Sequence, residues 1–373
     1  MELSGLSVAV IGGGIGGMAA AAALAQRGAQ VRLYEQAPEL SEVGAGLQIS
    51  ANGQVVLRAL QAVGQDIPTQ ATLSPGTHMR AGRSGRKVAF VPPPSSGATW
   101  YMHRADLLTL LIKSAERAGV EITLGRPVTP GTVRADLIVA ADGGQSTWRS
   151  VVDGPVAPAF TGQVAWRALV PCDPPVAADQ PATLAMGSRA HVVSYPLRSG
   201  RSMNIVAVEE RSGWTQEGWR QSGDPADFRA RFADFGGATG ALIARAEAVH
   251  LWALHLRPVA RRWADGRVAL LGDAAHPTVP FMAQGACLAL EDAWVLSSAL
   301  AHAGGVEAGL VAYQHARRAR AEAVVALARG NAWRFHLTPP WSWGARAVLA
   351  FGAGALARRL DWVYGYDATK VFT

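Results

Sequence analysis

The glycine-rich stretch near the start of the chain constrains the fold more than any other part of the sequence. Residues 6–36 read LSVAVIGGGIGGMAAAAALAQRGAQVRLYEQ. The apolar run 6–11 predicts a buried strand, the alanine-rich run 18–26 predicts a helix, and 30–34 predicts a second strand. Gly28 lies where a helix commonly ends. A strand, a glycine-rich turn, a helix and a strand in this order are typical of a Rossmann-type unit, so we expect an α/β fold.

The glycines of this turn fit the pattern G-x-G-x-x-G at Gly12, Gly14 and Gly17. The first glycine lets the strand turn sharply, the second lets a pyrophosphate approach the backbone, and the third allows close packing of helix on strand. Glu35 ends the second strand, where a carboxylate accepts a hydrogen bond from a ribose hydroxyl. We therefore expect an adenine dinucleotide without a 2′-phosphate, which leaves NAD and FAD open. Ile15 and Gly16 in the loop, and Gln36 after the second strand, would also contact this dinucleotide.

Length and composition set the remaining limits. A chain of 373 residues predicts two domains or one large one. The net charge of +7 reflects solvated arginines or favours an anionic small substrate. No Lys/Arg run with interleaved aromatic residues indicates a nucleic-acid partner. Cys172 and Cys287 are the two cysteines, which excludes a disulfide framework and a cysteine-rich metal site. This usage fits a reducing compartment, so we expect a cytoplasmic protein without a metal.

The two ends of the sequence give no membrane signal. The start lacks the basic segment of a signal peptide, and its apolar run is interrupted by glycines. The apolar run 347–357 is eleven residues long, too short to span a bilayer. We expect a helix that docks on the protein there and no stable membrane insertion, with a helix lying on a membrane surface as the alternative.

The order of expected elements divides the chain into three parts. Residues 1–70, 98–154 and 265–330 would form the dinucleotide-binding domain, and 71–97 with 155–264 would form an inserted antiparallel-sheet substrate domain. Residues 331–373 would form a C-terminal helical segment. Helices are expected over 52–63, 106–119, 225–235, 239–245, 284–303 and 307–331. Strands are expected over 87–91, 120–124, 136–141, 164–170, 191–196, 204–209 and 267–271.

Two further motifs follow buried strands. Asp142 with Gly143 follows the strand expected at 136–141, and Gly272 with Asp273 follows the one at 267–271. Ligands of open α/β sheets bind at these carboxyl ends. With residues 267–293, RVALLGDAAHPTVPFMAQGACLALEDA, the chain resembles the single-component FAD-dependent aromatic hydroxylases. This group includes salicylate hydroxylase, 3-hydroxybenzoate 6-hydroxylase and 6-hydroxynicotinate 3-monooxygenase, and the resemblance covers nearly the whole chain. It implies a fold like that of 4-hydroxybenzoate hydroxylase.

The resemblance assigns residues to FAD. Arg104, Asp142 and Asp273 would contact the cofactor, and Pro280 would shape the turn above the flavin ring. The helix that opens at Gln284 would point its N-terminus at the flavin N1 and C2 carbonyl, where its dipole stabilises the reduced, anionic ring. The loop 44–46 would pass close to the flavin because Gly44, Ala45 and Gly46 are small. Leu47, Gly272, Gly285 and Ala286 complete the expected cofactor contacts.

The inserted sheet would cover the aromatic substrate. His191 and Tyr195 lie four apart on one expected strand, so they share a face about 13 Å apart. The resemblance gives this pair contact with the substrate and a part in phenol deprotonation. Arg167 would meet an anionic group or face water, and His276 would lie near the flavin edge or serve the structure. Further substrate contacts are expected from Gln48, Pro280 and Gln284; Gln48 replaces a histidine of the 6-hydroxynicotinate enzyme, which disfavours that substrate.

The activity implied is hydroxylation of a small phenolic or heteroaromatic acid. NADH or NADPH, a transient co-substrate, would reduce FAD, and O₂ would form a flavin C4a-hydroperoxide that hydroxylates the ring. Alternatives are a flavoprotein acting on a non-phenolic ring such as urate and a non-catalytic nucleotide-binding redox protein. A flavin halogenase is disfavoured because 341–345, WSWGA, lacks the Ile-Pro of the halogenase signature. Whether the protein forms a homodimer stays open.

Overall fold

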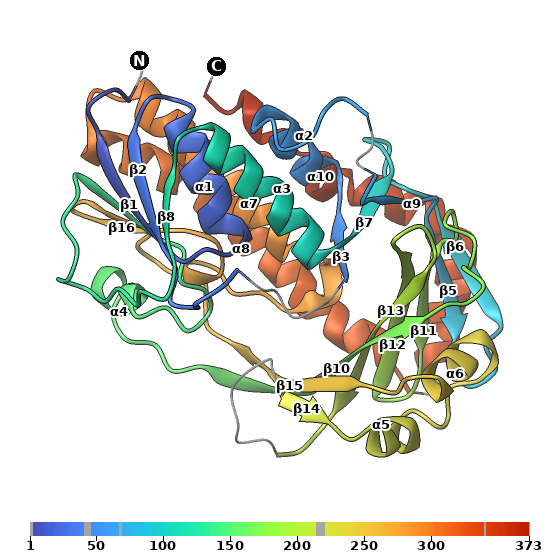
Figure 1. Cartoon of the computed structure of the whole chain (residues 1–373). Helices are drawn as coiled ribbons and strands as arrows, with labels where there is room; N and C mark the ends of the chain where they lie inside the picture. Colours follow the sequence, from blue (N-terminus) through green and yellow to red (C-terminus); the bar gives the residue numbers. More distant parts are fainter. Residues whose placement is uncertain (1–2, 41–45, 67–68, 214–220, 339–340, 373) are drawn as a thin grey trace.

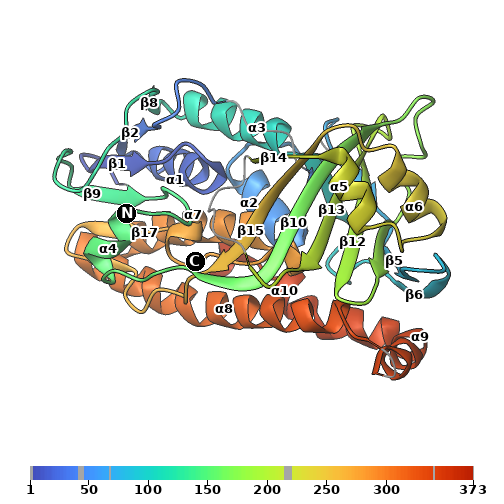
Figure 2. The ribbon, with the colours of Figure 1, turned by 90° about the horizontal axis from the view of Figure 1, so that it is seen from below.

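The computed structural model describes residues 3–40, 46–66, 69–213, 221–338 and 341–372. Two sheets lie at opposite ends of the molecule, and long helices run between them (Figures 1 and 2). The first sheet is parallel except for its edge strand β16, which pairs antiparallel with β17. Its strands in spatial order are β16 (Ala264–Asp265), β17 (Val268–Leu270), β9 (Leu137–Ala140), β1 (Ser7–Ile11), β2 (Gln30–Tyr34) and β8 (Glu121–Thr123).

The helix α1 (Ile15–Ala25) packs in the centre of this half. It contacts α3 (Arg104–Arg117) on one side and α7 (Gly285–His302) on the other, and α8 (Val306–Phe335) packs behind α7 (Figure 1). The alanines at 19–23 of α1 are fully buried, and their small side chains let three helices approach closely. This helix starts at Ile15, three residues earlier than the sequence predicted, because Gly14 already serves as its N-cap.

The second sheet has eight strands. In spatial order they are β14 (Gln221–Gly223), β15 (Val249–Leu256), β10 (Ala159–Pro171), β13 (Ser202–Glu210), β12 (Ala190–Leu197), β11 (Ala182–Met186), β5 (Thr77–Ala81) and β6 (Lys87–Val91). The expectation of a purely antiparallel sheet was wrong in one detail, since β5 runs parallel to β11. One face of the sheet is covered by α5 (Pro225–Arg231) and α6 (Gly237–Ala244), with Trp166 packed against Phe228 there.

Alternation along the strands decides which side chains face away from these helices. Trp166 packs under α5, so its neighbour Arg167 points to the opposite face of β10. On β12, Val192 packs toward α5 and α6, whereas His191 and Tyr195 face the other way. The inner face of the eight-stranded sheet therefore carries the side chains that the sequence singled out.

Smaller elements connect the two halves. A three-stranded sheet of β3 (Gly46–Ile49), β7 (Thr99–His103) and β4 (Thr72–Ser74) lies between them, next to α2 (Ala51–Ala59). The turns η1 (Gly272–Ala274) and η2 (Pro280–Met282) lead from β17 into α7. The helix α2 ends four residues earlier than expected, and Gln61 beyond it adopts a left-handed conformation with φ of 54°. The remaining short helices are α4 (Trp148–Val152), α10 (Asp361–Tyr364) and η3 (Ala368–Lys370).

The C-terminal helix α9 (Trp341–Arg359) packs against the edge strand β6, as the expected docking helix would (Figure 1). Its Leu349 and Ala353 join a small apolar cluster with Met79 and Ala89. In the parts of the chain that the structure describes, no helix combines the length and apolarity needed to cross a membrane. We propose that the domain division 1–70, 98–154, 265–330 against 71–97, 155–264 follows the two large sheets.

Candidate active site

A cavity of about 1720 Å³ lies between the two large sheets. At one end it is lined by the glycine turn after β1 and by the carboxyl ends of β9 and β17. At the other end it is lined by the inner face of the eight-stranded sheet, and α9 contributes part of the wall. The sequence-predicted residues that it brings together are Gly14, Ile15, Gly16, Gln36, Gly46, Leu47, Gln48, Arg104, Asp142, Arg167, His191, Tyr195, Gly272, Asp273, Pro280, Gln284, Gly285 and Ala286. Gly44 and Ala45 lie outside the described residues.

The three fingerprint glycines have separate geometric roles. A Cβ on Gly17 would lie 1.9 Å from the carbonyl oxygen of Gly12, so only glycine lets α1 pack on the end of β1. Gly12 itself has a φ of 104° and abuts the Ala141 carbonyl. A Cβ on Gly14, in contrast, would meet no described atom within 4 Å. Gly14 therefore leaves open space at the cavity end of α1, next to the free N–H groups of its first turn.

Glu35 closes the glycine turn onto β2. Its Oε2 accepts from the backbone N–H of Gly13 at 2.6 Å, and its Oε1 accepts from the N–H of Ala37 at 2.8 Å. Because a carboxylate offers about four lone-pair sites, a ribose contact is compatible with both bonds. That contact stays a prediction, and Gln36 rather than Glu35 lines the cavity.

Charged groups surround the middle of the cavity. Asp273 lies in η1, open to the cavity, and its removal from bulk water raises its pKa, while His276 and the Arg104 guanidinium oppose that shift. Arg104 begins α3 directly after β7. Across the cavity, Asp142 accepts from the backbone N–H of Thr147 at 2.9 Å, and burial raises its pKa as well. A cation thus stands among carboxylates where the parallel strands end.

The N-terminus of α7 opens directly into the cavity. Gly285 and Ala286 line it, and the first N–H groups of a helix have no acceptor within the helix. Ala283 adopts a left-handed conformation with φ of 52°, which turns the chain sharply from η2 into α7. This geometry presents partial positive charge to whatever occupies the cavity.

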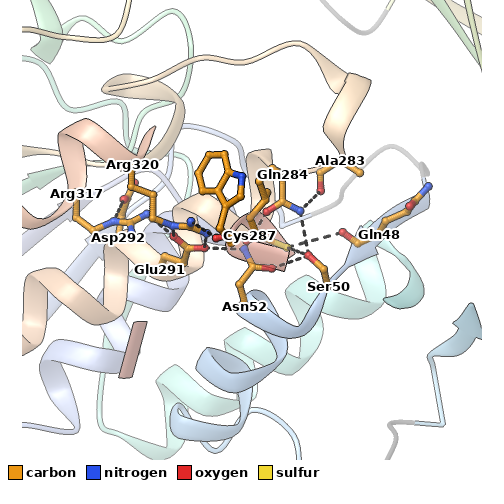
Figure 3. Close-up of polar contacts among 12 residues, drawn as sticks. Gln48, Ser50, Asn52, Ala283, Gln284, Cys287, Glu291, Asp292, Arg317 and Arg320 are labelled. Carbon is orange, nitrogen blue, oxygen red and sulfur yellow. Dashed lines mark hydrogen bonds and ion pairs between the residues drawn. The ribbon is translucent and has the colours of Figure 1, made fainter. Parts of the chain in front are cut away.

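Gln284 lines the cavity, and its side chain takes part in a buried polar network (Figure 3). Its Nε2 donates to Ser50 Oγ at 3.0 Å, and its Oε1 accepts from Asn52 Nδ2 at 2.8 Å. Only 2% of the residue is exposed. These bonds tie α7 to the segment that carries Gln48 and α2, and the expected substrate contact of Gln284 stays a prediction.

Two arginines of α8 hold the far end of this network (Figure 3). Glu291 accepts from Asn52 Nδ2 at 2.6 Å and pairs with Arg317 and Arg320 at 2.6 and 2.7 Å. The Arg320 guanidinium also lies 3.8 Å from the ring centroid of Tyr366. The C-terminal segment thereby fixes the position of α7 and of its N-terminus.

His276 does not reach the cavity. It is fully buried, and its Nε2 lies 2.5 Å from Asp292 Oδ2, which also accepts from the Gly272 N–H. Burial acts to lower its pKa, but the ion pair with Asp292 outweighs burial and raises it. Of the two roles that the sequence left open, the structure assigns the structural one, because the pair anchors η1 to α7.

The substrate half of the cavity has polar groups set in apolar walls. Tyr195 stacks on Tyr101 with ring centroids 4.8 Å apart and lies against Gly46, where a Cβ would be 2.7 Å from the Tyr195 ring. Burial raises the pKa of Tyr195, and the nearby charge of Arg167 opposes the shift. The Arg167 guanidinium lies 4.6 Å from the Trp252 ring centroid. Apolar walls come from Met79, Leu184, Met186, Val193 and Phe281.

His191 is 1% exposed, and burial, followed by the charge of His336, lowers its pKa well below the ordinary value. Its imidazole is therefore neutral at neutral pH. Its Nδ1 lies 2.8 Å from Nε2 of His336, whose Nδ1 lies 3.0 Å from Glu210 Oε1. Sequence reasoning missed His336 and Glu210, since they are 126 residues apart and fit no spacing motif.

Comparison with known proteins identifies the family. The FAD binding domain model matches residues 121–328, and an NAD(P)-binding Rossmann-like domain model matches 10–57. The chain is 35% identical to 3-amino-4-hydroxybenzoate 2-monooxygenase PtnB3 of Streptomyces platensis, covering 98% of this chain and 97% of that protein. It is 31% identical to 3-hydroxybenzoate 6-hydroxylase of Polaromonas naphthalenivorans, covering 97% and 96%. The chain belongs to the FAD-dependent aromatic-ring monooxygenases.

A solved member of these monooxygenases shares the whole fold. The structure of a salicylate hydroxylase substrate complex superimposes with a TM-score of 0.82 at 25% identity, covering 99% of this chain and 98% of that one. The expected family, the α/β fold and the FAD- and NAD(P)H-dependent oxidoreductase class are thus confirmed. A non-catalytic redox protein, one of the alternatives from sequence, is not supported.

The chain's own residues fit a flavin dinucleotide. The open space at Gly14 admits a pyrophosphate, and the Arg104 guanidinium supplies a cation beside it. The N-terminus of α7 supplies N–H groups and positive potential further along the same cavity. The cavity of this aromatic-ring monooxygenase therefore has donor groups for the phosphates at one end and for the flavin ring at the other.

Proposed function

We propose that this monooxygenase hydroxylates a small phenolic acid of the hydroxybenzoate type at the inner face of the eight-stranded sheet. One observation carries the proposal: β10 and β12 present a cation, Arg167, and a neutral imidazole, His191, to the cavity that the glycine turn and α7 also line. The pair suits a ring with a carboxylate and a phenolic hydroxyl. The relatives named above act on such rings by their names.

We assign the cofactor end to the following residues. The turn at Gly12, Gly14 and Gly17 would hold the pyrophosphate, and Glu35 would accept from the adenosine ribose. Arg104, Asp142 and Asp273 would bind the middle of FAD, and Gly285 and Ala286 would face its ring. Bound FAD, once reduced by NADH or NADPH, supplies the activation of O₂ that protein side chains lack.

The protein's own part is to bind, orient and deprotonate the ring. Arg167 would pair with the carboxylate, and its contact with Trp252 fixes the direction of the guanidinium. The neutral His191 would take the phenolic proton, which raises the electron density of the ring. Tyr195 keeps its own proton because its pKa is raised, so it would donate a hydrogen bond to the substrate oxygen. Met79, Leu184 and Met186 would exclude water from the ring.

The test is NADH and NADPH oxidation by the FAD-loaded protein with a panel of rings. The panel holds 3-amino-4-hydroxybenzoate, 3-hydroxybenzoate, 4-hydroxybenzoate, salicylate, 6-hydroxynicotinate and urate, and peroxide is quantified alongside. We expect one hydroxybenzoate to stimulate oxidation and to be recovered as its hydroxylated product. Stimulation with peroxide as the sole product would mark an effector. Hydroxylation of urate alone would overturn the phenolic-acid assignment.

A matched pair of variants tests the anion contact. Arg167→Gln removes the charge in the cavity, whereas Arg229→Gln removes one on the outer face of the same domain, where Arg229 bonds the Ala246 carbonyl. We expect Arg167→Gln to raise KM for the carboxylated substrate about tenfold or more, with FAD content unchanged. Equal KM values in the two variants would remove Arg167 from the substrate site.

A further inference from the structure

His191 belongs to a continuous chain of three titratable side chains from three elements. His191 of β12 contacts His336 at the end of α8 through Nδ1 and Nε2, 2.8 Å apart. His336 contacts Glu210 at the end of β13 through Nδ1 and Oε1, 3.0 Å apart. Both distances are ordinary hydrogen bonds. The rings of Phe281 and Phe335 lie 5.2 Å from the His191 ring, so the inner end of the chain is enclosed by apolar groups.

All three side chains line the cavity, and exposure rises at Glu210, the outer end of the chain. His191 is 1% exposed and the His336 side chain is also 1% exposed, whereas the Glu210 side chain is 33% exposed. The other oxygen of Glu210 accepts from Arg189 Nε at 3.0 Å, and the Arg189 side chain is largely in solvent. Arg189 thus holds the carboxylate with one oxygen toward His336 and leaves the group in contact with water.

The carboxylate dictates where the protons lie. Glu210 accepts, so His336 carries its proton on Nδ1 and offers the Nε2 lone pair. His191 must then donate from Nδ1, which leaves the Nε2 lone pair as the acceptor on the cavity side. The Gln163 amide lies 3.4 Å from the same His336 nitrogen and, with its oxygen turned there, would accept the same proton. No described residue hydrogen-bonds His191 Nε2.

We propose that His336 and Glu210 form a proton relay that sets the tautomer of His191 and connects it to solvent. The proposal rests on the proposed function of His191 as the base. The phenol O–H bond breaks as its proton binds His191 Nε2. The Nδ1 proton of His191 passes to His336 Nε2, and the Nδ1 proton of His336 passes to Glu210 and on to water. When the product oxygen is reprotonated, the same path in reverse restores both tautomers.

His336 and Glu210 are positioning residues, because both act through His191. The arrangement resembles in logic the carboxylate–imidazole pairs that orient a base in hydrolases. Here a second imidazole extends the pair and carries the proton from the side chain enclosed by Phe281 and Phe335 to Glu210, which is in contact with solvent. Without it, a proton accepted by the buried His191 would stay as an uncompensated charge among Phe281 and Phe335.

Glu210→Gln is the decisive variant. The amide oxygen of Gln still accepts a hydrogen bond from His336, but unlike a carboxylate it does not take up the proton. Its matched control is Glu209→Gln, on the same strand but on the opposite face, where Glu209 accepts from Trp166 Nε1 at 3.0 Å. We expect Glu210→Gln to lower kcat about tenfold near neutral pH, with KM and FAD content unchanged. The loss should shrink as pH rises, because the phenol then ionises without help.

A rate-independent readout is ¹⁵N NMR of histidine-labelled, FAD-loaded protein, with His191 and His336 assigned by single variants. We expect both rings to be protonated at Nδ1 in the wild type and in Glu209→Gln. His191 protonated at Nε2 would overturn the relay whatever the enzyme's substrate proves to be. A Glu210→Gln pH–rate profile that matches Glu209→Gln would also overturn it. If no phenolic compound is hydroxylated, the proposed function fails and the NMR result alone decides the tautomer.

Discussion

The Asn52 side-chain amide donates to two acceptors of α7 at once, Gln284 Oε1 at 2.8 Å and Glu291 Oε1 at 2.6 Å. The three side chains are fully or almost fully buried, so neither acceptor has water as a substitute. One residue of α2 therefore fixes both the first turn of α7 and the ion pairs that hold α7 to α8.

Asn52→Ala should accordingly destabilise the protein by about 1–3 kcal/mol, because it leaves the buried Gln284 Oε1 without a donor and leaves Glu291 Oε1 with Arg320 as its donor. The measurement is the free energy of unfolding in urea. The control is Gln65→Ala, which removes an exposed amide and should change that energy by less than about 0.5 kcal/mol. Similar losses of unfolding free energy in both variants would show that the hydrogen bonds of Asn52 do not stabilise the protein.

Gly14 and Gly17 should respond differently to the same added methyl group. Gly14→Ala places its Cβ in open space at a φ of −71°, so the protein should fold with stability changed by less than about 1 kcal/mol. The methyl group would lie where the pyrophosphate approaches, so FAD content after purification should fall. Gly17→Ala forces a Cβ to 1.9 Å from the Gly12 oxygen and should cost about 3 kcal/mol or more. Full FAD loading of the Gly14→Ala variant would show that the pyrophosphate does not bind at Gly14.

Tyr195 and Tyr101 stack on each other but should have separable roles. Tyr195→Phe should slow hydroxylation about tenfold at saturating substrate and leave FAD content unchanged. Tyr101→Phe should mainly lower stability, by about 1–3 kcal/mol, because its hydroxyl bonds Ser74 and accepts from the Ala182 N–H at 3.0 Å. Rates and urea melts on both variants make the comparison. A wild-type rate for Tyr195→Phe would remove this hydroxyl from the proposed chemistry.

His191 should make stability fall as the solution becomes acidic. Its folded-state pKa lies well below 6.5, so the unfolded chain binds more protons between that pKa and 6.5. Stability relative to His191→Gln should then decrease as pH drops below 6.5, by up to about 1.4 kcal/mol per pH unit. His276 has a raised pKa, so its contribution is present below 6.5 and is lost as pH rises through the folded value. The measurement is the free energy of unfolding in urea at several pH values. The stability difference between wild type and variant should change with pH in opposite directions for a His191 variant and a His276 variant.

Local sequence patterns were sufficient to predict the glycine turn and the sheet edge that line one end of the cavity. The roles of Gly12, Gly14 and Gly17 follow from backbone sterics within one turn, and Asp142 and Asp273 follow strands that end at one sheet edge. The period of two along β12 also placed His191 and Tyr195 on one face, as expected. In each case the side-chain direction is set by the element that carries the residue.

Patterns failed where direction depends on distant partners. The sequence left His276 open between the flavin edge and a structural role, and its pairing with Asp292 was not expected; nor were the bonds of Gln284 with Ser50 and Asn52. Ser50 and Asn52 come from another part of the chain, so spacing around α7 carries no signal of them. For the same reason, no local pattern predicted the contact of His336 with Glu210. The parallel pairing of β5 with β11 was also not predictable, because the two strands are about a hundred residues apart.

The interleaving of the two sheets has a consequence for biosynthesis. The first sheet needs β17, at residues 268–270, beside β9, at 137–140. The strands of the second sheet all lie before β9 or between β9 and β17 in the sequence. During synthesis, the edge of β9 that pairs with β17 therefore stays unpaired until more than two thirds of the chain has left the ribosome. Such long-range pairing is slow and exposes apolar surface. Fragments that end before α7 should aggregate rather than acquire FAD, so the nucleotide-binding half is not separable by truncation.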